Sequence, residues 1–224
     1  MNKSETIARI ISGGVIPVVR ASSKEEALAV IEAIAAGGIT TIEITMTVPG
    51  AVELMTKLSG REDLLIGAGS VLDPETAREC IAAGAQFIVS PATNFDTILY
   101  CNETEIVVMP GALTPTEIAN AWDAGADFVK VFPADSMGGA KYLKSLKAPL
   151  PDIKLIPTGG VSQSTAADFI KAGAEAVGVG ADLVDLKAIR EGRAEDITNA
   201  AKKYLEIVRE ARHSRPVLAP KVRP

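Results

Sequence analysis

Short apolar segments recur along the chain at intervals of roughly twenty to twenty-seven residues, and a stretch of helical periodicity follows each. The apolar segments are nearly continuous and rich in β-branched residues, as expected for strands of a parallel sheet that helices cover. We predict eight such strands, at residues 15–19, 41–46, 64–69, 87–91, 106–110, 128–132, 154–158 and 176–180. Each strand is therefore expected to be buried on both faces.

Four alanine-rich segments between these strands predict helices over residues 23–38, 73–85, 114–126 and 162–174. Each begins with Ser, Asp or Thr, which can cap the free N–H groups of a helix, and closes with a glycine suited to a left-handed C-cap. The segment 194–212 predicts a last covering helix. The repeated Ala-Gly-Ala endings are therefore structural, not chemical, motifs.

The repetition of strand and helix predicts an α/β fold, a closed (β/α)8 TIM barrel. An open doubly wound sheet has the same repetition, but the glycine-rich dinucleotide fingerprint is absent after the first strand. We therefore expect a single domain over residues 1–212. Residues 213–224, rich in proline and basic side chains, predict a mobile tail that contains the single histidine, His213.

Composition and net charge argue against several classes of binding partner. The net charge of −5 and the pI near 5.1 argue against binding to nucleic acid or to an anionic membrane. No uncharged apolar run reaches the roughly 18 residues of a spanning helix. The two cysteines, Cys80 and Cys101, have neither metal-site nor disulfide-framework spacing. These features predict a soluble cytoplasmic protein that acts on small molecules, with no metal site and no cofactor.

Polar side chains gather at the carboxyl ends of the predicted strands, which form one mouth in a barrel and carry its chemistry. Those candidates are Arg20, Glu43, Thr45, Ser70, Lys130 and Thr158. A single strand Glu or Lys is more often half of a structural ion pair. A glutamate and a lysine that both lie in apolar strands must nevertheless be paired or useful, since an isolated buried charge costs several kcal/mol.

Lys130 lies between Phe128, Val129, Val131 and Phe132. Loss of water and a nearby cation both favour its neutral amine, which can attack a ketone and form a Schiff base. The protonated imine stabilises a carbanion on the adjacent carbon, so this lysine can make or break a carbon–carbon bond. Glu43 is the candidate for moving the protons.

Two glycine-rich turns follow the last two strands and predict a phosphate site. Gly159 and Gly160 would let the backbone approach an anion, and Gly180 and Ala181 would open a short extra helix whose N–H groups face it. Each turn alone is equally well explained as tight-turn chemistry.

Two other stretches receive a structural interpretation. In residues 108–117, Pro110 and Pro115 are expected to stiffen a loop and set a helix start, although this loop could shape the floor of the mouth. Residues 90–94 are interpreted as a turn without a catalytic part.

The chain resembles the 2-keto-3-deoxy-6-phosphogluconate and 4-hydroxy-2-oxoglutarate aldolases over nearly its whole length. The resemblance is carried, in order and spacing, by IPVVR, IEITMTVPGA, GAGSVLDPETA, GAQFIVSP, MPGALTPTEI, GADFVKVFPAD and PTGGVS. It implies a metal-free class I aldolase on a homotrimeric barrel, a carbon–carbon lyase of the Entner–Doudoroff pathway. Such an enzyme cleaves its keto acid reversibly to pyruvate and an aldehyde, here glyceraldehyde 3-phosphate.

The resemblance implies that Lys130 forms the Schiff base and that Glu43 is the acid and base. It further implies a substrate-binding set and a phosphate-binding set around them. The substrate-binding set is Arg20, Thr45, Thr47, Ser70 and Thr158, and the phosphate-binding set is Gly159, Gly160, Gly180 and Ala181.

The chain departs from many family members at two places. Thr47 stands where they carry an arginine, and Ala181, followed by Asp182, stands where they carry a serine. The anion contact is therefore either missing or supplied by Arg20, and one hydroxyl donor is lost, although backbone N–H groups could still hold a phosphate. A shorter substrate such as 4-hydroxy-2-oxoglutarate, or the galactonate epimer, stays open.

Two other functions fit the pattern less closely. A phosphosugar isomerase or epimerase would keep the phosphate turns but needs no Schiff-base lysine, and a non-catalytic barrel scaffold needs neither Lys130 nor Glu43.

Overall fold

The apolar segments form parallel strands in the computed structural model, which describes residues 1–214. The strands are β1 (Val15–Val19), β2 (Thr41–Thr45), β3 (Leu65–Gly69), β4 (Phe87–Val89), β5 (Val107–Met109), β6 (Gly111–Ala112), β7 (Val129–Val131), β8 (Leu155–Pro157) and β9 (Val177–Val179). The fifth predicted strand, residues 106–110, is present as β5, and the chain continues past Pro110, which has no N–H to donate, as the unpredicted β6. The Pro110 carbonyl still accepts a 2.9 Å hydrogen bond from Lys130 N, so β5 and β6 share one position in the sheet.

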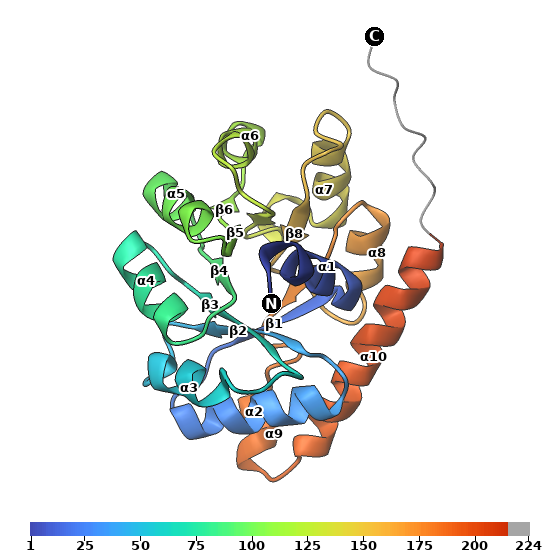
Figure 1. Cartoon of the computed structure of the whole chain (residues 1–224). Coiled ribbons are helices and arrows are strands. Elements are labelled where there is room, and N and C mark those ends of the chain that lie inside the picture. The colour runs from blue at the N-terminus through green and yellow to red at the C-terminus, as the bar shows by residue number, and fades with distance from the viewer. Residues whose placement is uncertain (215–224) are drawn as a thin grey trace.

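The strands close into a ring, as predicted. Strands β5, β4, β3, β2, β1 and β9 pair in that order, and β6, β7 and β8 form the continuation. A parallel bridge between Thr158 and Gly178 joins the end of β8 to β9. Figure 1 views this barrel along its axis, with the helices around it.

Successive strand residues face opposite sides of the sheet. Ile42 and Ile44 of β2 pack in the larger core between strands and helices, whereas Glu43, between them, faces the barrel interior. The interior is filled by a second cluster, Ile10, Ile16, Leu65, Phe87, Val89, Val107, Met109, Phe128, Ile156 and Ala176. The barrel is thus packed through most of its length.

The predicted helices are present as α2 (Lys24–Ala36), α4 (Pro74–Ala82), α6 (Pro115–Asp123), α8 (Ala166–Lys171) and α10 (Ala194–His213). Ser23, Asp73 and Thr114 accept the predicted capping bonds, and Pro115 occupies the start of α6. Helix α8 begins later than predicted because the Thr165 hydroxyl bonds Ser162 N and Gly160 O within a preceding turn. Gly38, Gly84, Gly125 and Gly173, which follow α2, α4, α6 and α8, have positive φ, as expected near helix C-termini.

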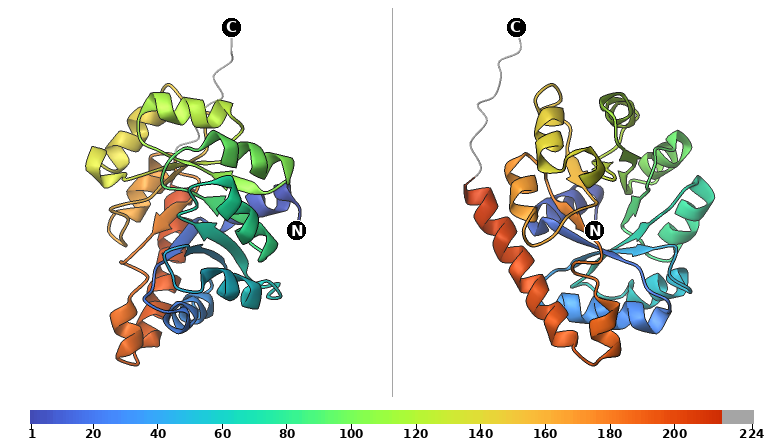
Figure 2. Two further views of the ribbon diagram at one scale, coloured as in Figure 1. Left: turned by 90° about the vertical axis from the view of Figure 1, so that its left-hand side faces the viewer. Right: turned by 180° about the vertical axis from the view of Figure 1, so that it is seen from behind.

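Further helical segments lie where none was predicted: α1 (Lys3–Gly13), α3 (Ala51–Leu58), α5 (Phe95–Glu103), α7 (Ala140–Lys147) and the 3₁₀ turn η1 (Asp135–Met137). The short extra helix predicted to open at Gly180 and Ala181 is present as α9 (Leu186–Arg190), which begins later. Helix α1 closes the N-terminal end of the barrel, in front in Figure 1 and seen from the side and from behind in Figure 2. Ile10, with Ile7 and Ile11, packs onto the interior cluster. Lys3 ion-pairs with Asp127 at 3.1 Å below β7.

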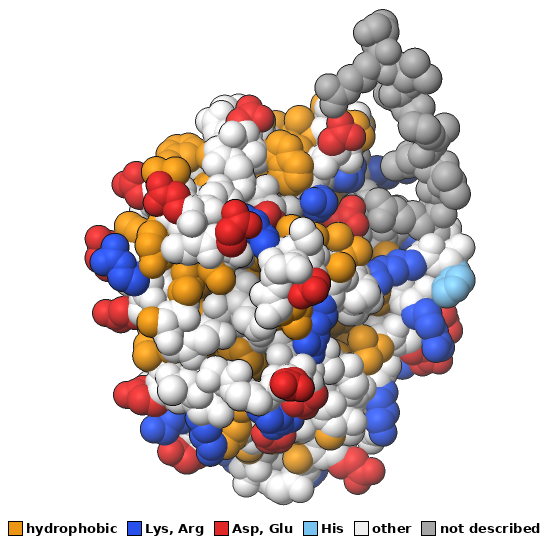
Figure 3. Space-filling view, in the orientation of Figure 1, with side chains coloured by type: hydrophobic (Ala, Val, Ile, Leu, Met, Phe, Trp, Pro, Cys, Tyr) orange, Lys and Arg blue, Asp and Glu red, His pale blue; other side chains and the backbone are white. Residues whose placement is uncertain are grey.

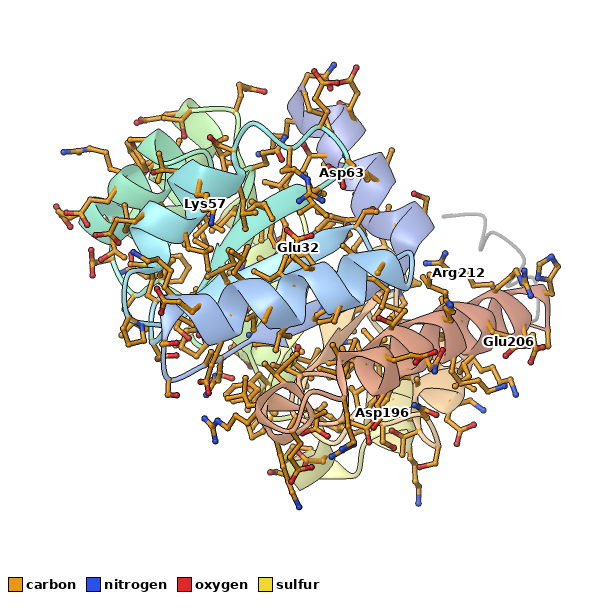
Figure 4. All side chains as sticks on the ribbon, turned by 90° about the horizontal axis from the view of Figure 1, so that it is seen from below. Glu32, Lys57, Asp63, Asp196, Glu206 and Arg212 are labelled. Atoms are coloured by element: carbon orange, nitrogen blue, oxygen red, sulfur yellow. The ribbon has the colours of Figure 1, made fainter. Side chains whose placement is uncertain are left out.

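Ion pairs and hydrogen bonds at the surface join the outer helices to neighbouring segments of the chain. In Figure 4, which looks from below, Glu32 of α2 and Asp63 lie near each other, and Arg61 ion-pairs with both, at 2.9 and 2.7 Å. Arg212 of α10 donates to the carbonyls of Ser12 and Glu175, both at 2.9 Å. On the face that carries α1, acidic, basic and hydrophobic side chains are interspersed (Figure 3), so this face has no large field of one sign.

Helix α10 ends at His213, one residue beyond the predicted end of the last helix, and Ser214 is its C-cap. The rest of the predicted tail, residues 215–224, lies outside the described residues. Within residues 1–214, no helix has both the length and the apolarity needed to cross a membrane.

Candidate active site

The predicted site residues meet at the end of the barrel opposite α1. Arg20 directly follows β1, Ser70 follows β3, Thr158 follows β8 and Gly180 follows β9. Parallel strands bring all four positions to one rim.

Lys130 and Glu43 lie deepest, as the middle residues of β7 and β2. These strands are opposite in the ring, with three strand positions between them in either direction. Lys130 Nζ is 3.6 Å from Glu43 Oε1, and the two side chains are only 7% and 4% exposed. The distance allows an ion pair but exceeds a good hydrogen bond, and within residues 1–214 Glu43 Oε1 is a buried oxygen without a hydrogen-bond partner.

The surroundings of Lys130 are otherwise apolar. Its Nζ lies 5.4 Å from the centre of the Phe132 ring, and Gly111 and Ile156 flank it on the neighbouring strands. Arg20 is exposed and, in the described part of the chain, makes no hydrogen bond or ion pair. Glu43 is thus the charged partner of the lysine, and the guanidinium is available for an anion at the rim.

Thr45 and Thr47 are joined to each other. The buried Thr45 hydroxyl donates to Val19 O at 3.0 Å and therefore accepts from Thr47, whose oxygen is 2.7 Å away. This bond fixes the end of β2 to the end of β1 and occupies the Thr45 hydroxyl. Thr47 itself is exposed in the loop that leads to α3.

Ser70 has a positive φ of 60° and is half-buried. A left-handed conformation is uncommon for residues other than glycine and is found preferentially at functional sites. It directs the backbone of Ser70 away from the strand path at the rim.

The turn after β8 requires its glycines. Gly159 and Gly160 have φ of 100° and 66°, and Asp135 of η1 packs against both. A Cβ on Gly159 would lie 2.9 Å from Asp135 Oδ1, and one on Gly160 would lie 2.4 Å from Asp135 Cβ. The sequence analysis did not identify Asp135 as part of the rim, although its position after β7 was a signal.

The turn after β9 differs from the prediction. Leu183 N and Val184 N donate to Gly180 O, but α9 begins only at Leu186, capped by Asp185. Gly180 and Ala181 therefore do not open the helix, because a separate turn intervenes.

The Asp182 carboxylate, which the sequence left unexplained, accepts from the Tyr204 hydroxyl of α10 and from Gln163 N at 3.3 Å. Burial and this hydrogen bond raise the pKa of Tyr204 above its usual value. The contact joins the loops after β8 and β9 to the last helix.

A cavity of about 430 Å³ opens beside the Lys130 strand, and the sequence analysis missed it. It is lined by Pro91, Thr93, Phe95, Leu113, Glu117 and Phe132, among others. Of residues 108–117, Gly111, Ala112, Leu113 and Glu117 line this cavity, which includes neither Lys130 nor Glu43, and residues 91–93 form one of its walls. The position of Pro91 after β4 was the available signal.

Among residues 1–214, no group of three or more His, Cys, Asp or Glu side chains is arranged to hold a metal ion.

The barrel and the lysine–glutamate pair in its mouth define an α/β-barrel enzyme. A sequence model described as "Aldolase: KDPG and KHG aldolase" matches residues 6–200, where KDPG is 2-keto-3-deoxy-6-phosphogluconate and KHG is 4-hydroxy-2-oxoglutarate. The chain belongs to this KDPG and KHG aldolase family.

Similar proteins agree with this membership. A 2-dehydro-3-deoxy-phosphogluconate aldolase of Pseudomonas aeruginosa is 37% identical over 157 residues, 70% of this chain and 71% of that protein. A structure of the Legionella pneumophila KDPG aldolase, with pyruvate captured as a covalent carbinolamine, is 31% identical with a TM-score of 0.81, covering 88% of this chain and 96% of that one. The Zymomonas mobilis KDPG aldolase with 3-phosphoglycerate is 25% identical with a TM-score of 0.80, covering 92% and 97%.

Proposed function

We propose that this protein is a class I aldolase that reversibly cleaves KDPG to pyruvate and glyceraldehyde 3-phosphate. The observation that carries the proposal is the buried pair of Lys130 and Glu43, 3.6 Å apart in the mouth of the barrel. A nucleophilic amine and an acid–base carboxylate within reach of one substrate are the two groups that Schiff-base chemistry needs.

The first step joins Lys130 to the substrate. The ammonium passes a proton to Glu43, and the resulting amine attacks the C2 ketone to form a carbinolamine. Glu43 returns the proton to the departing hydroxyl, so that water leaves, an iminium remains and Glu43 is again a carboxylate. The apolar surroundings of Lys130 exclude competing water, and its position on a central strand keeps the amine fixed.

The second step breaks the carbon–carbon bond. Glu43 takes the proton of the C4 hydroxyl, the C3–C4 electron pair moves into the enamine, and the aldehyde is released. Glu43 then returns a proton to C3, and hydrolysis of the imine frees pyruvate and Lys130. The 3.6 Å gap suits transfer through a substrate hydroxyl or one water molecule.

The rim residues are proposed to hold the two ends of the substrate. Arg20, unpaired in the described chain, and Ser70 would bind the keto-acid carboxylate, with Thr47 and the buried Thr158 near the substrate chain. The N–H groups of Gly159, Gly160, Gly180 and Ala181 would bind phosphate.

One observation favours KHG as a second substrate. The Asp182 carboxylate bonds Gln163 N beside the proposed phosphate turns, and negative charge there weakens binding of a phosphate dianion. KHG has no phosphate, so it carries no phosphate dianion for this carboxylate to repel. We also propose a homotrimer in the cytoplasm, with a role in the Entner–Doudoroff pathway. No separate observation favours an isomerase or a scaffold.

The test is mass spectrometry after incubation with pyruvate and borohydride, which reduces an imine to a stable amine. We expect one pyruvate-sized addition on Lys130, absent in Lys130→Met. Lys147 is an internal control, because this other buried lysine donates to the carbonyls of Pro151 and Ile153 at 2.7 and 2.8 Å and should stay unmodified. No adduct on folded protein would refute the covalent mechanism.

A further inference from the structure

The position of the Glu43 carboxylate is not explained by hydrogen bonds to its Oε1 atom. That oxygen is buried and has no hydrogen-bond partner in the described chain, and its ion-pair partner is 3.6 Å away. Packing must therefore contribute to placing the carboxylate beside Lys130.

The neighbouring strand supplies the space. Glu43 pairs in register with Gly67, and Thr45 pairs with Gly69. A Cβ built on Gly69 would lie 2.1 Å from Glu43 Oε1 and 2.6 Å from both Cδ and Cγ. These distances are far below the roughly 3.5–4.0 Å of carbon contacts. The glutamate side chain thus leans toward the mouth and lies over Gly69.

The backbone conformation at position 69 does not itself require glycine. It is absent from the positive-φ glycines, so alanine can adopt its backbone angles. Any effect of a methyl group at this position is consequently steric and is directed at the Glu43 side chain.

The same arrangement recurs at a second site residue. A Cβ on Gly178 of β9 would lie 2.2 Å from the hydroxyl oxygen of Thr158. Gly67, one inward position below Gly69, instead faces the Phe87 ring at 2.2 Å, which belongs to the apolar interior. Inward glycines therefore make room for polar side chains at the mouth and for an aromatic ring in the core.

We propose that Gly69 is a positioning residue for the acid–base step: the space left by its missing side chain lets Glu43 point at Lys130. This inference rests on the proposed aldolase function. A methyl group at position 69 displaces the carboxylate, so proton transfer is slowed while Lys130 can still form the imine.

The first experiment separates these two steps in Gly69→Ala. Exchange of the pyruvate methyl protons in D2O reports proton transfer, and borohydride trapping reports the imine. We expect exchange to fall by about 10²-fold, as for a roughly 1 Å misplacement, with trapping at Lys130 retained. If Gly69 acts through Glu43, Gly69→Ala adds no further loss to Glu43→Gln. Exchange at the wild-type rate, or full additivity, would overturn the proposal.

The matched control is Gly67→Ala combined with Phe87→Leu, which shortens the ring that the new methyl would meet. It places a methyl on the same strand and face, at a position where the three nearest atoms belong to the Phe87 ring and not to the Glu43 side chain, so we expect exchange within a few-fold of wild type. A loss as large as that of Gly69→Ala would mean general distortion of β3, and the proposal would fall.

A thermal-unfolding cycle tests the contact without using activity. Gly69→Ala should lower Tm in the wild type but much less in a Glu43→Ala background, where the overlapping atoms are gone. Equal losses in both backgrounds would refute the contact. If the wild type forms no pyruvate adduct, the aldolase proposal fails separately, and this cycle still decides whether Gly69 positions Glu43.

Discussion

Lys130 and Glu43 are buried on opposite strands, and each is the only charge near enough to pair with the other among the ion pairs of the described residues. A carboxylate with an unsatisfied buried oxygen is costly to keep, since desolvation of a polar group without a compensating bond costs about 1–3 kcal/mol. A purely structural ion pair would be expected to close to hydrogen-bond distance. At 3.6 Å, the two groups can both reach one substrate hydroxyl that lies to the side of the line joining them.

Glu43→Gln keeps the size of the side chain and removes its ability to take a proton. We expect carbon–carbon cleavage to slow by about 10²–10⁴-fold, because general acid–base catalysis contributes about that much. Imine formation with pyruvate should persist and is checked by trapping. An unchanged cleavage rate would reduce Glu43 to a structural partner of Lys130.

The pairing of Lys130 and Glu43 was predictable from the sequence because two charges inside β-branched strands must be paired or useful, although either one alone is more often half of a structural ion pair. Other features depend on distances that no local pattern contains. Three examples are the bond from Thr45 to Val19 O, the contact of Asp135 with the glycine turn, and the position of the Glu43 side chain over Gly69. Each contact joins residues that belong to, or follow, different strands. They follow only from the register and curvature of the closed ring.

At the scale of elements, one hydroxyl connects the last helix to the mouth. Tyr204 of α10 is fully buried and donates to Asp182 in the turn after β9, which also accepts from Gln163 N in the turn after β8. The two predicted phosphate turns are thereby tied to the last helix. The Asp182 carboxylate is itself exposed, so its charge stays solvated.

Tyr204→Phe should lower the free energy of unfolding at pH 7 by about 0.5–1.5 kcal/mol, because the exposed Asp182 carboxylate is screened by water and the bond contributes no more than an ordinary hydrogen bond. The raised pKa of Tyr204 also predicts a pH effect. The native state keeps the phenol proton above pH 10, where the unfolded state loses it, so this stabilisation is present below pH 10 and is lost as pH rises. Urea titrations at neutral and alkaline pH should show a weaker alkaline loss in Tyr204→Phe. An identical alkaline loss would contradict this assignment.

Helices were predicted correctly from the sequence where an N-capping residue and a C-terminal glycine both lie next to the helical segment. Ser23, Asp73 and Thr114 mark the starts of three predicted helices correctly. Helix α1 was missed, although Asn2 and Glu5 form a capping box, because its apolar side chains face the barrel interior instead of a neighbouring helix. Its place could not be deduced before the ring and its open end were known.

At the scale of the whole molecule, α1 completes the interior core at the end remote from the site. Ile10 is 1% exposed and packs among the interior residues of the barrel. Ile10→Ala should lower the free energy of unfolding by about 2–5 kcal/mol, because it leaves a cavity in a packed core. Cleavage activity per folded molecule should stay unchanged, since no site residue is touched. Denaturant titration and steady-state assays measure the two effects, and a parallel loss of activity would show that the two ends of the barrel are coupled.

Helix α1 also determines the route by which the substrate and products of the proposed reaction enter and leave the barrel. Because α1 fills the N-terminal end of the barrel, the substrate must enter and both products must leave at the opposite end, the rim that carries Arg20 and Ser70. The pyruvate half is covalently held at the floor, so the aldehyde, nearer the exit, departs first whatever the relative affinities. In the synthetic direction, pyruvate must bind before the aldehyde. An aldehyde that binds first blocks the access of pyruvate to Lys130. The architecture therefore imposes an ordered sequence and makes excess aldehyde an inhibitor of its own condensation.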